Sequence, residues 1–202
     1  MEQNKEIYIY GKSGHGKVVA DIALANSYVI SGWIDDDPRK EAMSWEKFNQ
    51  LIPKGTSIAL GIGDNVIRKS LAYKILSAGY SLPPLIHPSA IVSPSVSIES
   101  GAVIMPLCVI NANAHVGTGV IINSAAIIEH DCIIEGFAHI SPNAALAGNV
   151  KIGSMSHIGI GSSIIQNITI GENTLIGAGS VVIDSIPPKC TAVGIPCRVI
   201  HT

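Results

Sequence analysis

One histidine of this chain stands between two carboxylates. His130 lies inside the tripeptide Glu129-His130-Asp131, two residues after the aliphatic Ile128. A neighbouring carboxylate fixes the tautomer of an imidazole and stabilises the imidazolium that forms when the ring takes up a proton. The tripeptide therefore has the composition of a general base with its orienting acid. An exposed histidine beside acidic residues is also a common surface feature, so the chemistry depends on where the fold places it.

A glycine-rich turn, GKSGHG at residues 11–16, follows the first apolar stretch. Its order, GxxGxG, matches neither the dinucleotide fingerprint nor the phosphate loop. Glycines at such a turn let a backbone approach a phosphate, and the next helix N-terminus presents free N–H groups to an anion. Two acidic residues end the following strand, where a nucleotide's hydroxyls or base edge would lie. We predict a nucleotide site at Gly14, His15, Gly16, Asp35 and Asp36, the alternative being a tight turn beside solvated carboxylates.

The second half of the chain has a period of six residues. Every sixth residue from Val92 to Val182 is aliphatic, and the residue two before each is small or β-branched. A helix repeats its apolar face at about 3.6 residues and a strand at 2, whereas a period of six fits a parallel β-helix of hexapeptide repeats. Each hexapeptide thus sends one large and one small side chain into a narrow core. Three sides close a triangular coil of about eighteen residues, which predicts roughly five coils.

The first part of the chain alternates strand and helix patterns instead. Strands are expected at Ile7–Tyr10, Val29–Ile34 and Ser57–Ile62, and helices at Lys17–Asn26 and Asn65–Ala78. This alternation is typical of a half-sized, Rossmann-like parallel α/β unit.

Prolines mark the boundary between the two patterns, because a residue before proline is pushed toward extended conformations. Pro83-Pro84 and His87-Pro88 lie there. We predict an α/β domain at residues 1–87 and a β-helix domain with a C-terminal cap at residues 88–202.

Composition excludes several classes of protein. The net charge of −2 and the absence of a lysine or arginine run argue against a nucleic-acid partner. The first apolar stretch is too short for a signal peptide and no segment reaches the length of a membrane span, so we expect a cytoplasmic protein. The four cysteines lack paired CxxC spacing; Cys108 and Cys132 fall in the small-residue register and are predicted to be buried thiols.

Three histidines, His115, His139 and His157, each precede a core aliphatic residue, which directs their side chains outward. His139 and His157 are eighteen residues apart and are expected to stack on adjacent coils. Hexapeptide solenoids can hold zinc between subunits through three histidines. The gamma-type carbonic anhydrases show a histidine pair five residues apart for this purpose, and this chain has none. We therefore predict no metal site.

Nearly the whole chain resembles the nucleotide-sugar acetyltransferases of bacterial glycan synthesis. The resemblance is carried by IYIYGKSGHGKVVADIA, DDD, GIGDNVIRK, LIHPSA, INSAAIIEHDC, HISPNAALAGNVKIG and AVGIPCRVI. It is closest to the UDP-N-acetylbacillosamine N-acetyltransferases of protein glycosylation, with the sialic-acid O-acetyltransferase group as broader kin. SGHG and IEHDC are its specific parts. The family's solenoid is a left-handed parallel β-helix, a handedness that period counting does not give.

The resemblance implies roles for individual residues. His130 would take a proton from the C4 amine of a UDP-4-amino-4,6-dideoxy sugar as that amine attacks the thioester of acetyl-CoA, and Asp131 would orient His130. His139 would lie close to the acetyl group, and Asn123 would reach toward the sugar. The nucleotide positions are Gly14, His15, Asp35 and Asp36. CoA would lie in a groove between neighbouring solenoids near Ile160, Gly177 and Ala178, where one close relative has a glycine in place of this alanine.

Other functions remain open at this point. The acceptor could be a hydroxyl, giving an O-acetyltransferase, or the amine of a GDP-sugar. A non-catalytic nucleotide-sugar-binding scaffold is disfavoured, because it would not need the Glu129-His130-Asp131 tripeptide.

The flat sides of a solenoid also predict assembly. Outward rows that include Val109, Ile121, Ile127 and Ile133 are more apolar than one subunit can cover, and a three-sided prism suits threefold packing. We expect a homotrimer with active sites between subunits.

Overall fold

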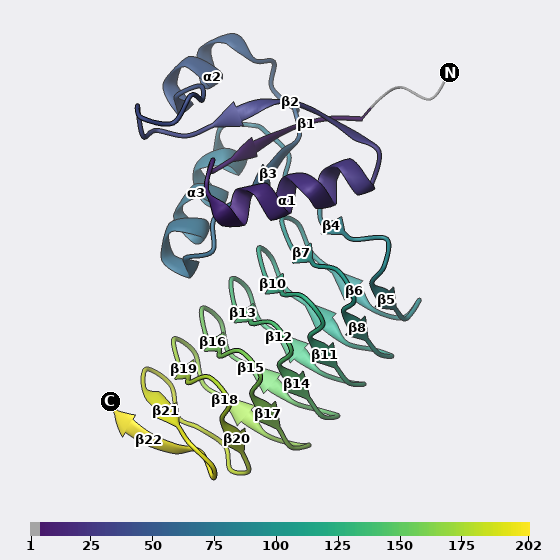
Figure 1. Ribbon diagram of the computed structural model, residues 1–202, viewed down its shortest axis with the longest axis vertical. Coiled ribbons are helices and arrows are strands. Elements are labelled where there is room, and N and C mark those ends of the chain that lie inside the picture. Colours follow the sequence, from purple (N-terminus) through teal and green to yellow (C-terminus); the bar gives the residue numbers. More distant parts are fainter. Residues whose placement is uncertain (1–4) are drawn as a thin grey trace.

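A computed structural model describes residues 5–202 and shows an α/β unit followed by a β-solenoid (Figure 1). The α/β unit has a parallel three-stranded sheet in the order β2-β1-β3, which confirms the predicted half-sized unit. Its elements are β1 (Lys5–Tyr10), α1 (Gly14–Ala25), β2 (Tyr28–Ile34), α2 (Trp45–Leu51), β3 (Ile58–Leu60) and α3 (Asn65–Ser77).

Two helices of this unit differ from the sequence prediction. Helix α1 begins at Gly14 rather than at Lys17, so half of the glycine turn is already helical. Helix α2 was not predicted, because its seven residues lie in a segment without a clear apolar period. The Ser44 side chain caps α2 by accepting from the backbone N–H of Lys47, and the buried Phe48 anchors the helix.

The solenoid has three flat faces, each a parallel sheet up to its C-terminal cap. The eight-stranded face contains β4 (Leu85–Ile86), β7 (Val103–Ile104), β10 (Ile121–Ile122), β13 (His139–Ile140), β16 (His157–Ile158), β19 (Leu175–Ile176), β21 (Thr191–Val193) and the antiparallel β22 (Arg198–His201). The six-stranded face contains β5 (Ile91–Val92), β8 (Val109–Ile110), β11 (Ile127–Ile128), β14 (Ala145–Leu146), β17 (Ser163–Ile164) and β20 (Val181–Val182). The five-stranded face contains β6 (Ser97–Ile98), β9 (His115–Val116), β12 (Ile133–Ile134), β15 (Lys151–Ile152) and β18 (Thr169–Ile170).

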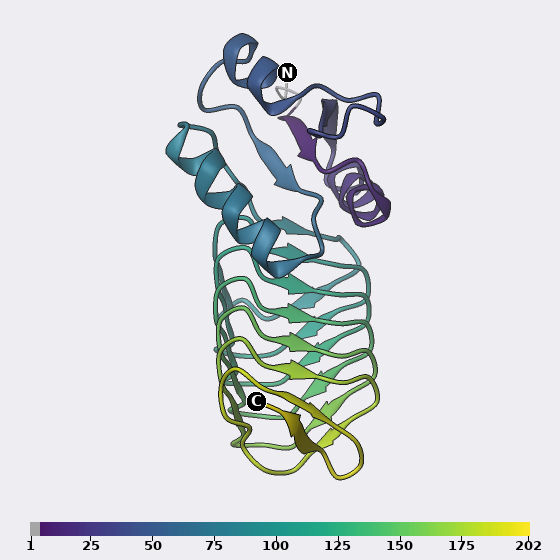
Figure 2. The same cartoon turned by 90° about the vertical axis from the view of Figure 1, so that its left-hand side faces the viewer.

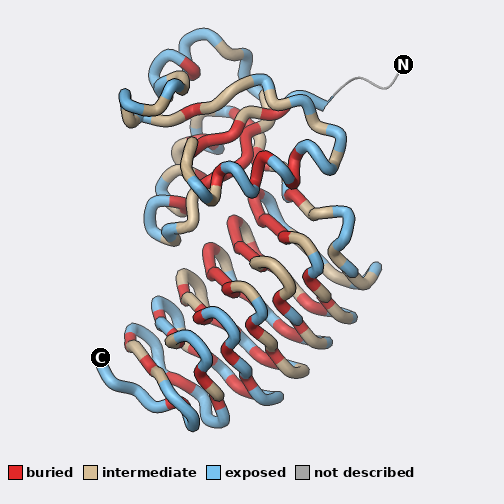
Figure 3. Tube along the Cα trace, in the orientation of Figure 1, coloured by how far each residue is buried: buried red, intermediate tan, exposed pale blue. Residues whose placement is uncertain are grey.

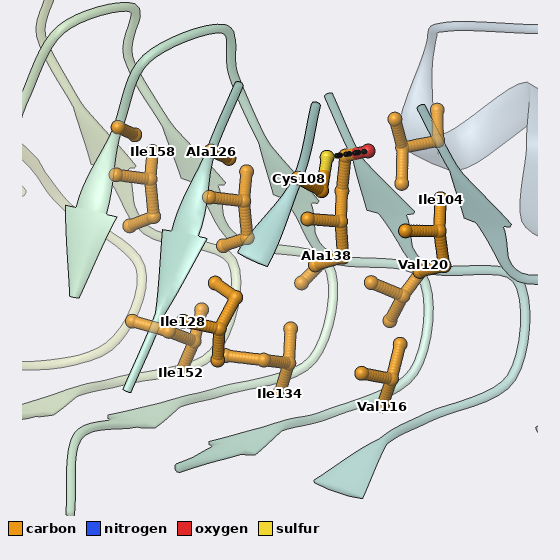
Figure 4. Packing of buried hydrophobic residues seen from close by; sticks show 14 of the residues in the cluster. Ile104, Cys108, Val116, Val120, Ala126, Ile128, Ile134, Ala138, Ile152 and Ile158 are labelled. Atoms are coloured by element: carbon orange, nitrogen blue, oxygen red, sulfur yellow. Dashed lines mark hydrogen bonds between the residues drawn. The ribbon is translucent and has the colours of Figure 1, made fainter. Parts of the chain in front are cut away.

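Each coil takes eighteen residues, as predicted: Ile121 pairs with His139, which pairs with His157. The coils match a left-handed β-helix of hexapeptide repeats. Their core contains large and small side chains, and Figure 4 shows the large Ile128, Ile134 and Ile152 lying together in it. Cys108 and Cys132 are buried free thiols, which confirms their predicted place.

The corners of the coils share one backbone conformation. A residue with positive φ recurs every six positions, and these positions carry mostly asparagine or glycine, which tolerate it best. We name the three corners after residues they contain. The Asn123 corner joins the eight- and six-stranded faces, the His130 corner joins the six- and five-stranded faces, and the Phe137 corner joins the five- and eight-stranded faces.

The α/β unit packs on the first rungs of the eight-stranded face (Figure 2). Ile7 and Val19 of the unit share one apolar cluster with Val103 and Ile121 of the solenoid, and buried residues run continuously through the junction (Figure 3). Ile121 is therefore fully buried within one chain. The prediction that it belongs to an apolar surface left for a second subunit to cover was wrong. The face itself begins at β4, which pairs with β7.

Candidate functional site

His130 and Asp131 form a hydrogen-bonded pair at the His130 corner. Nδ1 of His130 lies 2.8 Å from Oδ2 of Asp131, and the side chains are 61% and 52% exposed. Asn113, one coil earlier, donates from Nδ2 to the other carboxylate oxygen at 3.3 Å. These bonds, the one from His130 first, hold the pKa of Asp131 below its usual range. The carboxylate thus stays ionised and holds the ring proton on Nδ1, which leaves Nε2 to accept a second proton.

A glycine of the next coil makes room for this imidazole. Gly148 occupies the same corner position as His130, eighteen residues later. A Cβ atom on Gly148 would lie 2.6 Å from both Cε1 and Nε2 of the His130 ring. Real Cβ contacts are never this short, so any larger side chain at this position would displace the imidazole.

His139 leaves the coil on its outward side, as predicted, but it is only 9% exposed because the α/β unit covers it. The ring thus points out of its coil without facing solvent. Its Nε2 lies 3.0 Å from Nδ2 of Asn123, whose amide oxygen accepts from the backbone N–H of Ser124 at 2.8 Å. Asn123 therefore donates to Nε2, and the ring proton lies on Nδ1. The ring stacks on that of His157 with centroids 4.6 Å apart, which confirms the predicted stacking.

The surroundings of His139 keep it neutral. Burial, together with the nearby His157, Arg68 and His15, lowers its pKa to about 3. Its Nδ1 is buried and makes no hydrogen bond with any of the residues 5–202. The Gly63 backbone lies nearby. At neutral pH the ring can give or accept a hydrogen bond, but it cannot exchange protons as a base.

The residues implied in CoA binding follow Asn123 down one edge of the solenoid. Ile160, Gly177 and Ala178 all lie at the Asn123 corner, on later coils. Ile160 is 53% exposed. A Cβ on Gly177 would lie 2.6 Å from Cγ1 of Val193, so this glycine makes room for the Val193 side chain of the next coil. Ala178 beside it is exposed, so an extended ligand has access to this corner at Ile160 and Ala178.

In the α/β unit, two glycines of the turn have different tasks. A Cβ on Gly16 would lie 1.8 Å from the carbonyl oxygen of Gly11, so this glycine permits the close approach of α1 to the end of β1. A Cβ on Gly14 would meet nothing within 4 Å. Gly14 is exposed, and it leaves the first turn of α1 open to a ligand.

The two predicted nucleotide carboxylates are both engaged within the protein. Asp35 accepts from the backbone N–H of Lys12 at 2.8 Å and from Nζ of Lys40 at 2.9 Å, so it ties the glycine turn to the end of β2. Asp36 accepts from the hydroxyl of Tyr10 and from the backbone N–H of Trp45, both at 2.7 Å. Partial burial opposes ionisation of Asp35, but its hydrogen bonds, that from Lys40 first, outweigh this and lower its pKa.

His15 connects the glycine turn with the solenoid. Its ring lies beside Gly63, where a Cβ would be 4.0 Å from Cγ of His15. Its Nε2 is buried without a hydrogen-bond partner among the described residues. Burial and, to a smaller extent, the charge of Arg68 lower its pKa to about 4. His15 and His139 thus flank Gly63 from two domains.

One chain does not bring all predicted site residues together. Asn123, His139 and His15 gather where the eight-stranded face meets the α/β unit. His130 and Asp131 lie at the corner opposite that face, between the other two sheets. The sequence prediction missed Gly148 and the buried Arg68. Only the eighteen-residue spacing from His130 to Gly148 could have indicated the first.

Two family models match the chain: the PglD N-terminal domain at residues 6–75 and the bacterial transferase hexapeptide (six repeats) at residues 149–184. A variant of perosamine N-acetyltransferase from Caulobacter crescentus, solved with CoA and GDP-perosamine, is 32% identical with a TM-score of 0.93, over 100% of this chain and 99% of that one. This chain belongs to the hexapeptide-repeat nucleotide-sugar N-acetyltransferases.

Two further members of these N-acetyltransferases support the assignment. The acetyltransferase domain of PglB from Neisseria gonorrhoeae FA1090, solved with acetyl coenzyme A, is 37% identical with a TM-score of 0.91, over 98% of this chain and 100% of that one. The UDP-N-acetylbacillosamine N-acetyltransferase of Bacillus subtilis (strain 168) is 38% identical over 111 residues, or 50% of this chain and 51% of that protein. The match thus spans about half the length of this curated relative.

Within residues 5–202, no group of three His, Cys, Asp or Glu side chains is placed to hold a metal ion. The helices of the same range are all too short or too polar to cross a membrane.

Proposed function

We propose that this protein transfers the acetyl group of acetyl-CoA to the C4 amine of a UDP-4-amino-4,6-dideoxy sugar, the step that forms UDP-N,N'-diacetylbacillosamine. The observation that carries the proposal is the exposed His130–Asp131 pair, with its proton-accepting nitrogen pointing away from the carboxylate. Relatives that bind CoA with a nucleotide amino sugar support it.

The chemistry needs only a base and an oriented amine. The amine nitrogen attacks the thioester carbonyl carbon while Nε2 of His130 takes the proton that the amine loses. The tetrahedral intermediate then collapses, the C–S bond breaks, and the CoA thiolate receives a proton from the imidazolium. The carboxylate of Asp131 stabilises the imidazolium between these two transfers.

His139 is better suited to hydrogen bonding than to proton transfer. Because Asn123 donates to its Nε2, the Nδ1–H is the group that could stabilise a developing oxyanion. That nitrogen is buried beside Gly63, between the eight-stranded face and the α/β unit; we call this contact region the seam. Nδ1 therefore reaches a ligand only where the bound acetyl group enters the seam.

The placement of these groups supports an active site made by two chains. Within one solenoid, His130 lies at the corner opposite the face that carries His139, so both can serve one substrate only when two solenoids lie side by side. The outer surface of the six-stranded face is available for such packing, since Ile91 and Ile127 on it are 69% and 40% exposed. We therefore expect a homotrimer. Light scattering that gives a monomer at micromolar concentration would contradict this assembly.

The function is tested by thiol release from acetyl-CoA against a panel of UDP- and GDP-linked 4-amino sugars and their 4-hydroxy counterparts. We expect turnover with the UDP-amino sugar and mass-spectrometric detection of its amide. Preference for the GDP-amino sugar would favour the second candidate, which the likeness to the perosamine enzyme supports. Transfer to a hydroxyl would make the protein an O-acetyltransferase, and release with no acceptor of the panel would revive the scaffold alternative.

Nucleotide binding should be separable from CoA binding. Replacing Asp35 and Asp36 by alanine removes the acceptors that hold the Lys12 backbone and the Trp45 backbone, so the glycine turn loses its support. We expect UDP-sugar affinity to fall about tenfold or more, the scale of one or two lost charge-assisted hydrogen bonds, with CoA affinity unchanged. Calorimetry that shows equal loss of both ligands would contradict the assignment of the nucleotide to the α/β unit.

A further inference from the structure

Arg68 is completely buried where helix α3 meets the solenoid. Its side chain is 0% exposed, and each nitrogen of its guanidinium donates a hydrogen bond. The acceptors, none of which is a carboxylate, are the carbonyl oxygens of Gly119 (2.7 Å), Gly63 (2.8 Å), Phe137 (2.8 Å), Ile62 (3.3 Å) and Ala138 (3.4 Å) and the amide oxygen of Asn65 (2.8 Å). Burying a charge that only neutral dipoles compensate is costly, so the side chain must serve more than filling space.

The acceptors on the solenoid occupy equivalent positions of successive coils. Gly119, Phe137 and Met155 are eighteen residues apart and have φ angles of 62°, 61° and 64° at the Phe137 corner. Arg68 binds the carbonyls of the first two. Asn65, one helical turn earlier on α3, donates to the carbonyl of Met155 at 2.9 Å. Two side chains on one face of a helix thus engage three consecutive coils.

We propose that Arg68, assisted by Asn65, is a positioning residue that locks the α/β unit onto these three coils and so fixes His15 and the glycine turn relative to His139. The planar guanidinium suits this task, because its donors have fixed directions and define an angle as well as a distance. On the other side, Arg68 binds the carbonyls of Ile62 and Gly63, the loop that both imidazoles flank. The inference rests on the proposed function in one respect: the nucleotide site of the α/β unit and His139 of the solenoid must come together during acetyl transfer.

Electrostatics in the seam agree with this placement. The groups that face Arg68 are His15 on α1, His139 on β13 and His157 on β16, with Asp64 the nearest acid at the start of α3. Burial lowers the pKa of each of these histidines, and the charge of Arg68 lowers it further. The rings therefore stay neutral beside a fixed positive charge, and an anionic ligand group arriving at the seam meets a favourable potential.

Three variants of the whole chain separate the hydrogen bonds by which Arg68 holds the α/β unit on the solenoid from the effect of its positive charge. Arg68→Met removes both the hydrogen bonds and the charge. Arg68→Lys keeps the charge but loses the planar set of guanidinium donors. Asn65→Ala removes the hydrogen bond to the carbonyl of Met155 while Arg68 keeps its charge. The readouts are calorimetric unfolding, NMR titration of the histidine rings, isothermal titration with UDP and with CoA as probes, and kcat.

For the wild type we expect one unfolding transition. Arg68→Met should unfold in two steps with the α/β unit first, and its His15 and His139 pKa values should rise by about one unit, the size of one screened charge interaction at this range. Arg68→Lys should also uncouple unfolding but leave the histidine pKa values low. Arg68→Lys, which keeps the charge, should bind UDP and CoA within about threefold of the wild type. In both variants kcat should fall about 10- to 100-fold because the α/β unit and the solenoid no longer align.

If Arg68→Lys and Asn65→Ala each unfolded in a single transition like that of the wild type, the proposal would be overturned, even if Arg68→Met failed to fold. Unchanged histidine titrations in a folded Arg68→Met would overturn it as well. If the wild type turned over none of the sugars, the proposed function would fail, but unfolding and titration would still decide the role of Arg68.

Discussion

Replacing His130 by alanine is expected to lower kcat by about 10²–10⁴-fold, the usual loss when a general base is removed. The Michaelis constants for acetyl-CoA and for the amino sugar should change only modestly, because the proton moves in the transition state and not during binding. Raising the pH should partly rescue the variant, since more of the substrate amine is then already deprotonated. Steady-state kinetics between pH 6 and 9 would measure all three effects.

Two neighbouring substitutions sharpen this prediction. Asp131→Asn keeps a hydrogen bond to His130 but removes the charge that stabilises the imidazolium, so its kcat should fall between wild type and His130→Ala. His139→Ala should leave the shape of the pH profile unchanged, because the pKa of His139, about 3, keeps that ring neutral throughout the assay range. A His130→Ala variant with near-normal kcat at pH 7 would show that proximity of a deprotonated amine to the thioester is sufficient.

Replacing Gly148 by alanine is expected to lower kcat by about 100-fold without unfolding the protein. The added methyl carbon would lie 2.6 Å from Nε2 of His130, and the exposed ring can relieve this contact only by turning away. Gly148 is not among the residues with positive φ, so alanine fits the backbone and the cost falls on the orientation of His130. A misplacement of about 1 Å at a reacting group can cost this much in rate.

Gly136→Ala is the matched control for this substitution. Gly136 also lies at a corner of the solenoid, but a Cβ there would meet only the carbonyl oxygen of Thr118, at an ordinary 3.4 Å. Both variants should have melting temperatures close to that of the wild type, and only Gly148→Ala should lose kcat. Full activity of Gly148→Ala would mean that the orientation of the His130 ring does not matter.

The solenoid could be predicted because each hexapeptide of the sequence determines its own side of a coil. The aliphatic residue at every sixth position, from Val92 to Val182, determines both the side chains that enter the core and the length of a coil. The corners follow the same rule, since asparagine and glycine recur where φ is positive. The stacking of His139 on His157 could be predicted from the same spacing.

What the sequence could not show depends on how the two parts dock. His139 and Ile121 point outward from their coils, and only the packing of the α/β unit buries them. The carbonyl partners of Arg68 have no sequence signature, because every residue carries a carbonyl. Asp35 was predicted to face a nucleotide, but its hydrogen bond to the backbone of Lys12 depends on a contact between two loops.

The claim that two chains build each active site is tested most directly by mixing two inactive variants. His130→Ala removes the base, and Ala178→Trp fills the Asn123 corner where CoA is proposed to lie, at an exposed position that tolerates a large side chain. Each variant alone should have little activity. After both are unfolded together and refolded as equal mixtures, about one site in four should combine an intact His130 with an intact Asn123 corner from the neighbouring chain, so activity should return to about a quarter of wild type. No recovery in mixed trimers, or full activity of Ala178→Trp alone, would contradict this arrangement.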